Sequence, residues 1–326
     1  MRQPKQIITY LSKGITKSSR DIYELSNSKL CWLAKNLLTY SKKNKGPGFS
    51  INLEESEECM EKLAVVIKCV DKEKNAYVFV PNETTPVPME VALMMMVNRP
   101  PTCPNIIRLL DWTETASVYI MVIERPFFCQ DLSDFMHSQG GKLSEPVAKC
   151  FFKQITEAVQ YCHFKGVFHN DVKKENILVV TGTFQLKLID FGCGFFLKDT
   201  EYSGHVGTIP YFAPERFLYN TFRAIPSTVW TLGVNLFEMV SGFLPFSSID
   251  DILRNTPPFL FGISEGEMKK KTTDLMVNYF KFIPFFKFFS TSILILECRD
   301  LIKCCLTFDS NQRPCLEDLL RHKWLQ

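Results

Sequence analysis

The sequence predicts an α+β fold with two lobes, a small β-rich lobe followed by a larger helical lobe. The chain has 326 residues, which is longer than one ordinary domain. Over about residues 63–124 the apolar residues are often β-branched and occur in short runs bounded by turn residues, as in strands. Beyond Pro126 they recur at spacings of three and four, as they do on the buried face of a helix.

The first lobe is expected to contain three strands and one main helix. Leu63–Val70 predicts a strand, because it is rich in Val and Ile and is followed by the charged turn 71–75. Met89–Val97 predicts a helix, opened and closed by nearby prolines. Ile106–Trp112 and Ser117–Glu124 predict two paired strands.

The second lobe is expected to be mainly helical. Asp131–Gln139 and Glu145–Phe164 carry apolar residues at helical spacing. Asn176–Val180 and Leu186–Ile189 predict two short strands with a turn between them. Further helices are predicted over Ala213–Leu218, Ser227–Ser241, Glu297–Thr307 and Leu316–Leu325.

The charge is distributed unevenly along the chain. Residues 1–45 contain ten basic and two acidic residues, a net charge of +8, which leaves 28 basic and 33 acidic residues, a net charge of −5, in the rest. A mildly acidic body suits a basic protein substrate better than nucleic acid, so we expect no nucleic-acid partner. Residues 1–45 are expected to form a solvated, partly disordered basic extension of loop with short helical patches.

The twelve cysteines show no regular spacing and no C-x-x-C motif, and the chain does not start with a signal-peptide pattern. We therefore expect reduced thiols and a cytoplasmic location, with the nucleus as a second location. The apolar stretch Leu275–Leu296 contains Lys281 and Lys287 near its middle, which argues against a membrane span.

Several short motifs occur in a fixed order. His169–Asn176 lies between the long predicted helix and a short strand, Asp190-Phe191-Gly192 follows the next strand, and Ala213-Pro214-Glu215 comes later. Upstream, Lys68 lies on a predicted strand and Glu90 on a predicted helix. This ordered set resembles the protein-kinase signature, which implies the two-lobed protein kinase fold. We expect that domain over 46–326, with an N-lobe over 46–125 and a C-lobe over 127–326.

The resemblance implies a transfer of the ATP γ-phosphate to a protein hydroxyl, with Mg²⁺ as the cofactor. Asn176 and Asp190 would hold the metal, since Mg²⁺ prefers hard oxygen ligands. Lys68 would hold the α- and β-phosphates, and Glu90 would fix the direction of that lysine.

Two residues of the central motif are implied to act on the reacting groups. Asp171 would accept the proton of the substrate hydroxyl, and Lys173 would offset charge on the moving phosphate. Each of these residues taken alone could equally be a surface ion pair, a helix cap or a turn residue.

Other segments narrow the resemblance to the Pim family of serine/threonine kinases. They are Glu124-Arg125-Pro126 at the junction of the lobes, Pro88–Val91, Ile107–Trp112, Leu186–Gly192 and Leu197–Thr200. The resemblance spans about residues 63–261 and 297–326.

That family implies further binding roles. Glu124 would lie at the ATP site and Asp131 would bond the ribose. Asp134 and Glu175 would face basic side chains of the peptide, although both could also be solvated acids. The expected state is a monomer that acts on proteins with basic flanking residues.

The chain departs from the signature at three places. Gly46 and Gly48 match two glycines of the phosphate-covering loop, but the third is missing and Pro47 lacks an N–H. This loop leaves open the alternative of a pseudokinase that serves as a binding or scaffold module. Asn170 stands where an arginine that pairs with a loop phosphate is usual, so we expect activity without loop phosphorylation. Residues 262–296 are expected to be an insertion.

Overall fold

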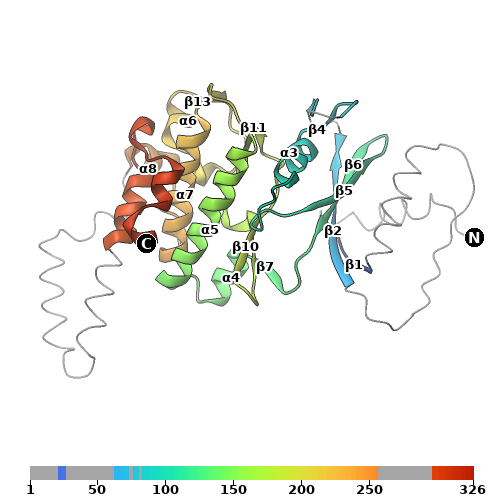
Figure 1. The fold of residues 1–326 in the computed structure, drawn as a ribbon. Helices are drawn as coiled ribbons and strands as arrows, with labels where there is room; N and C mark the ends of the chain where they lie inside the picture. The colour runs from blue at the N-terminus through green and yellow to red at the C-terminus, as the bar shows by residue number, and fades with distance from the viewer. Residues whose placement is uncertain (1–20, 27–61, 73–75, 81–82, 256–295) are drawn as a thin grey trace, which may run out of the picture. The chain divides into compact units, whose positions relative to one another are not determined.

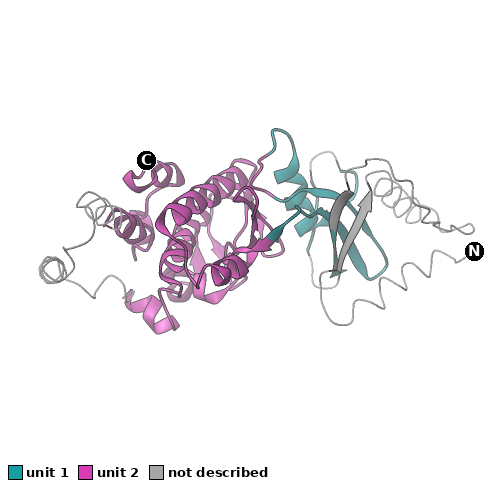
Figure 2. Ribbon diagram, turned by 90° about the horizontal axis from the view of Figure 1, so that it is seen from below, with its two compact units in different colours: residues 1–102, 107–129 teal, residues 103–106, 130–326 magenta. Residues whose placement is uncertain are grey.

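The computed structural model describes residues 21–26, 62–72, 76–80, 83–255 and 296–326 (Figure 1). These residues fall into two compact units, shown in different colours in Figure 2. Unit 1 comprises the described residues up to Thr102 together with Ile107–Cys129. Unit 2 comprises Cys103–Ile106 and the described residues from Gln130 onward. The order of a strand-rich unit and a helical unit confirms the predicted α+β fold class.

Unit 1 is built on an antiparallel four-stranded sheet with the strand order β1-β2-β6-β5. The strands are β1 (Asp21–Ser26), β2 (Lys62–Asp71), β5 (Leu109–Glu114) and β6 (Val118–Glu124). Four consecutive residues of β6, from Tyr119 to Val122, are buried. A continuous apolar run of this kind is typical of a strand that is covered on both faces.

Strand β1 differs from the expectation of loop and short helical patches over 1–45. Asp21–Ser26 pairs with β2 in antiparallel register, with Asp21 opposite Ile67 and Ser26 opposite Lys62. The six residues therefore belong to the sheet. Local pattern did not reveal the strand, because its hydrogen-bond partner lies far along the chain. Gly46, Gly48 and the rest of 27–61 lie outside the described residues.

The main helix of unit 1 is α3 (Met89–Asn98), which packs against β5 (Figure 1). It is preceded by a short pair of strands, β3 (Tyr77–Val78) and β4 (Val87–Pro88). Pro88 stands at the N-cap, where a missing N–H costs nothing. Most of the helix is buried, including Glu90, which has a relative exposure of 3%.

The core of unit 2 forms between α5 (Glu145–Phe164) and α7 (Ala224–Ser241), which pack side by side (Figure 1). The apolar residues predicted for the inner face of α5 are buried, among them Phe151 and Ile155. A helix over 296–305 follows later and approaches α7 so closely that a Cβ at Gly233 would lie 2.5 Å from the Cβ of Cys305. Gly233 is therefore required by packing.

A small sheet and several short elements surround these helices. The sheet has the order β10-β9-β7, built from β7 (Cys129–Asp131), β9 (Ile177–Val180) and β10 (Gln185–Leu188). The other elements of unit 2 are α4 (Leu132–Ser138), β8 (Val167–Phe168), η2 (Lys174–Asn176), β11 (Phe195–Phe196), β12 (Tyr202–Ser203), η3 (Ile209–Tyr211), α6 (Pro214–Leu218), β13 (Thr221–Phe222), α8 (Ile249–Arg254), η4 (Ser310–Gln312), α12 (Leu316–Leu320) and η5 (Lys323–Leu325).

Most predicted elements differ from the structure by one to three residues at an end, as the helix predicted from Ser227 begins at Ala224, and two others differ in ways that affect their contacts. The strand predicted from Ile106 begins at Leu109, and Ile106 makes an isolated bridge to Leu188 instead. The helix predicted over 316–325 ends at Leu320 and resumes as η5, where His322 accepts a hydrogen bond from the Trp324 N–H. All but the last residue of the predicted insertion 262–296 lies outside the described residues.

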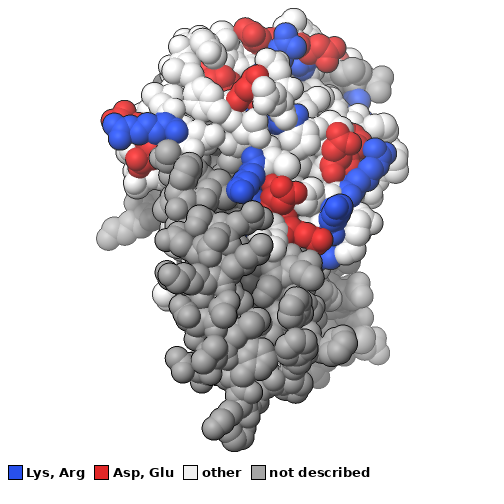
Figure 3. Space-filling view, turned by 90° about the vertical axis from the view of Figure 1, so that its left-hand side faces the viewer, with Lys and Arg blue, Asp and Glu red and all other residues white. Residues whose placement is uncertain are grey.

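Within the described residues, no helix is both long and apolar enough to cross a membrane. On the face of the molecule in Figure 3, acidic and basic side chains of the described residues lie next to one another. Mixed charges of this kind do not produce a strong field of one sign.

Candidate active site

In unit 1 the structure brings Lys68 and Glu90 together. Lys68 lies on β2 opposite Met121 of β6, and its Nζ is 2.6 Å from Glu90 Oε1. The Tyr119 hydroxyl donates to the other oxygen of Glu90 at 3.3 Å. The carboxylate is buried and the lysine is 22% exposed, so the pair places a cation at a fixed point on the sheet.

Glu124 ends β6 and holds the neighbouring strand. Its N–H donates to the Arg108 carbonyl at 3.0 Å, and its Oε1 accepts from the Arg108 N–H at 2.9 Å. In the structure Glu124 holds the backbone of Arg108, and its place at the ATP site stays a prediction.

In unit 2 the predicted motif lies between β8 and β9. Asp171 and Lys173 form an ion pair, with 2.9 Å between Asp171 Oδ2 and Lys173 Nζ. The Asn176 Nδ2 group donates to the carbonyl and to Oδ2 of Asp171, at 2.9 and 3.0 Å. Two of the predicted side chains, those of Lys173 and Asn176, therefore contact the Asp171 carboxylate, and the Asn176 bonds join the end of η2 to Asp171.

One oxygen of this carboxylate remains unused. Asp171 is 8% exposed, and its Oδ1 is buried without a hydrogen-bond partner within the described residues. A buried acceptor without a donor is costly unless a ligand supplies one. Asp171 Oδ1 is therefore suited to accept a hydrogen bond from a hydroxyl group.

His169 connects this loop to the Asp190 motif. Its Nδ1 accepts from the Asp171 N–H at 3.3 Å, so Nε2 carries the proton and donates to the Ile189 carbonyl at 3.0 Å. Burial lowers the pKa of His169, which favours this neutral form. The imidazole also makes an edge contact with Phe191, at 4.8 Å between ring centroids.

Asp190 follows β10 with a left-handed backbone, φ 63°, and its Oδ1 accepts from the Gly192 N–H at 3.2 Å. The Ile189 N–H donates to the Asn176 carbonyl at 2.9 Å, which ties the segment before Asp190 to η2. The Asn176 Oδ1 atom accepts no hydrogen bond within the described residues. An amide oxygen and a carboxylate are hard ligands, so this pair fits a Mg²⁺ ion.

The activation segment, defined here as residues 190–215, is fastened to the same loop. Lys173 Nζ donates to Thr208 Oγ1 at 2.6 Å. Gly207 has φ +116°, and a Cβ there would lie 2.9 Å from the Asn170 carbonyl oxygen. Glycine is therefore needed where the segment crosses the loop.

An aromatic cluster holds the middle of the activation segment. Tyr202 on β12 stacks on Phe222 of β13, with ring centroids 5.6 Å apart, and also packs against Phe168. The Tyr202 hydroxyl donates to the Phe196 carbonyl at 2.8 Å. Side-chain packing thus holds the part of the segment around Tyr202.

The predicted peptide-facing acids lie on two elements in contact. Asp134 is on α4 and Glu175 on η2, and α4 packs against η2. Both side chains are exposed, and neither forms an ion pair within the described residues. Asp131, predicted to bond the ribose, caps α4 by accepting from the Asp134 N–H at 2.8 Å.

A second polar network was not predicted. Glu238 on α7 is buried and accepts from Lys174 Nζ at 2.6 Å and from the Tyr211 hydroxyl at 2.7 Å. Burial raises the pKa of Tyr211, which keeps that phenol protonated. The network ties η2 and η3 to α7. The sequence carries no signal for this network, because its three residues are far apart along the chain.

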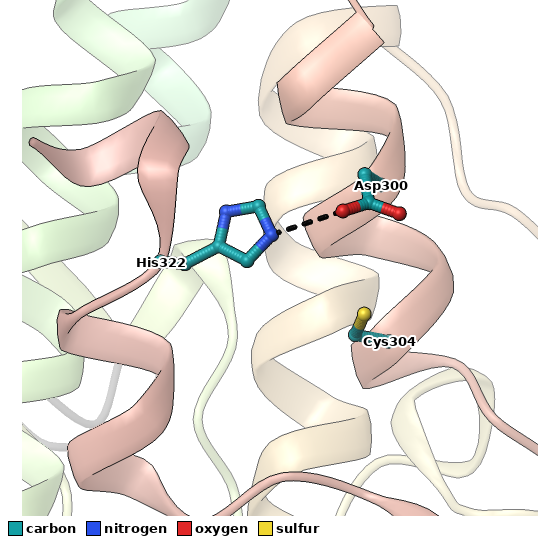
Figure 4. Close-up of side chains that lie close together, drawn as sticks. All are labelled: Asp300, Cys304 and His322. Carbon is teal, nitrogen blue, oxygen red and sulfur yellow. Dashed lines mark hydrogen bonds and ion pairs between the residues drawn. The ribbon is translucent and has the colours of Figure 1, made fainter.

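Asp300, Cys304 and His322 form a separate group of potential metal ligands (Figure 4). His322 Nδ1 accepts from the Trp324 N–H at 3.2 Å, so the neutral ring carries its proton on Nε2. That nitrogen lies 3.3 Å from Asp300 Oδ2 and donates to it (Figure 4). The ring therefore has no free lone pair for a metal, and we interpret the group as a surface hydrogen bond.

A family model described as "Protein kinase domain" matches residues 55–325. "Serine/threonine-protein kinase pim-2" of Danio rerio is 39% identical over 267 residues, which cover 80% of this chain and 76% of that protein. "Serine/threonine-protein kinase prk-2" of Caenorhabditis elegans is 35% identical over 240 residues, or 74% of this chain and 47% of that protein.

"Sperm motility kinase 2B" of Mus musculus is 32% identical over 242 residues, which cover 74% of this chain and 43% of that protein. The chain thus spans less than half of the length of two of these three relatives. Nothing in the relatives or in the described residues supports the pseudokinase alternative. The match along most of the chain shows that it belongs to the protein kinase family, within the serine/threonine class.

Proposed function

We propose that this protein is a Pim-type kinase that uses ATP and Mg²⁺ to phosphorylate Ser or Thr next to basic residues. The observation that carries the proposal is the unused Asp171 Oδ1, in a carboxylate otherwise held by Lys173 and Asn176. The 39% identity to the Danio rerio protein over most of both chains supports the Pim assignment.

The roles of the residues in unit 2 follow from their contacts. Asp171 Oδ1 accepts the hydrogen bond of the substrate hydroxyl and orients its oxygen for attack. Lys173, held between Asp171 and Thr208, keeps a positive charge beside the reacting groups. Asn176 and Asp190 would hold Mg²⁺, which supplies charge neutralisation for the phosphate oxygens when bound.

In unit 1 the buried Glu90 carboxylate fixes the Lys68 ammonium, which binds the phosphates of ATP. A lysine without that partner would keep its charge but lose its direction, because its four-carbon stem is flexible. Glu124, at the end of β6, and Asp131, at the start of α4, are proposed to contact the nucleoside. The glycines at 46 and 48 are proposed to cover the phosphates.

The preference for basic substrates rests on Asp134 and Glu175. Two exposed carboxylates on packed elements, without basic partners among the described residues, create a local negative potential. This potential would attract a cationic side chain of a peptide substrate.

A second proposal concerns the cellular location. The nine cysteines whose side chains the structure describes are free thiols, which supports a location in the reducing cytoplasm or the nucleus.

A peptide assay tests the substrate preference. We would compare kcat/KM for a Ser peptide with upstream arginines and for one with alanines, using wild type, Asp134→Asn and Glu175→Gln. Each substitution should lower the preference for the basic peptide by about two- to fivefold, as expected for exposed charge pairs. Added salt should reduce the wild-type preference in the same direction.

Asp250→Asn provides the matched control, because Asp250 is an exposed acid on α8. It should leave the ratio of the two peptides unchanged. Equal kcat/KM for both peptides in the wild type would refute the substrate preference, and no transfer to either peptide with ATP and Mg²⁺ would refute the proposed activity.

A further inference from the structure

Arg216, the residue after the Ala213-Pro214-Glu215 motif, lies inside unit 2 and not on its surface. It is 2% exposed, and its guanidinium carbon lies 3.7 Å from the centroid of Phe212 and 3.8 Å from that of Phe222. The guanidinium is thus stacked between two aromatic rings, a geometry that favours a cation.

The two terminal nitrogens of Arg216 are used by the activation segment and the catalytic loop. Nη1 donates to Asn170 Oδ1 at 3.0 Å, and Nη2 donates to the Val206 carbonyl at 2.9 Å. Asn170 completes the network with its Nδ2 group, which donates to the carbonyls of Cys193 and Val206, each at 3.0 Å. Asn170 has φ 63°, a left-handed conformation that asparagine tolerates better than most residues.

Two points of the activation segment, Cys193 and Val206, therefore meet Arg216 at the Asn170 amide. An amide can do this because it offers an acceptor to the guanidinium and two donors to the carbonyls. Arginine at position 170 would offer donors only. The oxygens of the nearby Glu215 accept from Arg313 and make no hydrogen bond to Arg216 within the described residues, although the charges of Glu215 and Asp171 act favourably on Arg216.

We propose that Arg216 is a positioning residue that orders the activation segment through Asn170, in place of a loop phosphate. The expected effect of Arg216 on catalysis rests on the proposed function. Its expected effect on the order of the activation segment rests only on the contacts described above. The guanidinium is buried between Phe212 and Phe222, with Nη1 and Nη2 bonded and Nε buried without a partner among the described residues, so it is not accessible to a phosphate on the segment. Arg216 instead holds the segment by its hydrogen bonds to Asn170 and to the Val206 carbonyl, without a phosphate.

The proposal can be tested without relying on activity. Hydrogen exchange would be measured on the full chain, treated with phosphatase and checked by mass spectrometry, for wild type, Arg216→Ala, Arg216→Lys and Asn170→Ala. In the dephosphorylated wild type, amides over 193–208 should exchange slowly. They should exchange at least about tenfold faster in all three variants, because lysine keeps the charge but not the planar fork.

Arg223→Ala is the matched control, because Arg223 is an exposed arginine next to β13 and its loss removes the same charge. It should exchange like wild type over 193–208. Far-UV circular dichroism and thermal unfolding would identify a variant that fails to fold. Asn170→Ala then keeps the test decisive, since Asn170 lies outside the stacked aromatic rings.

Kinetics provide the second readout. For Arg216→Ala, kcat/KM for the basic peptide should fall by about tenfold to a hundredfold, as expected for misplaced reacting groups, while KM for ATP stays close to wild type. The Asn170→Ala/Arg216→Ala double variant should be no worse than the poorer single variant, since the two residues act as one unit.

Three results would overturn the proposal. They are unchanged exchange over 193–208 in Arg216→Ala, full rescue by Arg216→Lys, and a segment in the wild type that becomes protected only after phosphorylation. A wild type without activity but with the expected exchange pattern would refute the proposed function and support the positioning role.

Discussion

Replacing Glu215 by Gln should destabilise unit 2 strongly, because Glu215 holds a buried arginine. Arg313 donates from Nη1 to Glu215 Oε1 at 2.8 Å and from Nη2 to Oε2 at 2.7 Å. The arginine side chain is 0% exposed and that of Glu215 is 9% exposed. Arg313 also donates to the carbonyls of Thr307, Pro226 and Phe308. The pair therefore joins α6 and the start of α7 to the segment 307–313.

The size of the effect follows from this burial. Glutamine keeps the shape of Glu215 and leaves the Arg313 charge without a counter-ion. Breaking a buried pair in this way costs about 3–5 kcal/mol. For a unit of about 150–250 residues, 1 kcal/mol corresponds to about 2–4 °C in Tm, so Tm should fall by about 6–20 °C.

Thermal unfolding, followed by circular dichroism at one scan rate, would measure the change. Arg321→Ala is the control, because Arg321 and Asp318 are 3.9 Å apart with side chains 77% and 60% exposed. That exposed pair contributes about 0–1 kcal/mol, so the control should melt close to wild type. If Glu215→Gln also melted close to wild type, the contribution assigned to the buried pair would be wrong.

Two further predictions concern catalysis and pH. Lys68→Met and Asp190→Asn should each abolish phosphotransfer in an autophosphorylation assay while leaving the circular dichroism spectrum unchanged; wild-type activity in either variant would contradict the assigned roles. Burial lowers the pKa of His163 to about 4, and both ring nitrogens lack partners within the described residues. The unfolded state therefore binds a proton at His163 more readily than the folded state does. The free energy of unfolding is thus highest above about pH 6.5, and it decreases by about 3 kcal/mol as the pH falls towards 4. In urea unfolding, the difference in the free energy of unfolding between pH 7 and pH 4.5 should be smaller for His163→Phe than for wild type. An equal difference in the two proteins would refute the role given to His163.

The sequence was informative where the residues of a motif lie close together in the chain or on neighbouring elements. Asp171, Lys173 and Asn176 lie within six residues of one another between two elements that periodicity alone predicts, and the structure brings them together. The resemblance to the kinase signature implied that Glu90 fixes the direction of Lys68, and their atoms are 2.6 Å apart. In both cases a short loop or a neighbouring element limits where the side chain can lie.

The sequence was uninformative where the contact depends on distant residues. Strand β1 is defined by its pairing with β2, across residues 27–61, and its own six residues carry too weak a pattern to predict it. The contacts among Lys174, Tyr211 and Glu238 likewise join three separate elements. Tertiary pairing of this kind leaves no periodic signal in a single sequence.

Asn170 shows how the two kinds of information combine. From the sequence, its neutral amide only indicated that one partner of a loop phosphate is missing. The structure adds that the amide is bonded to Cys193, Val206 and Arg216, and that Arg216 is stacked between two phenylalanines. An uncharged residue at 170 is therefore a condition for this network, because a second guanidinium there would face Arg216 in a buried site. The departure from the signature at position 170 and the buried arginine at position 216 are thus two parts of one arrangement.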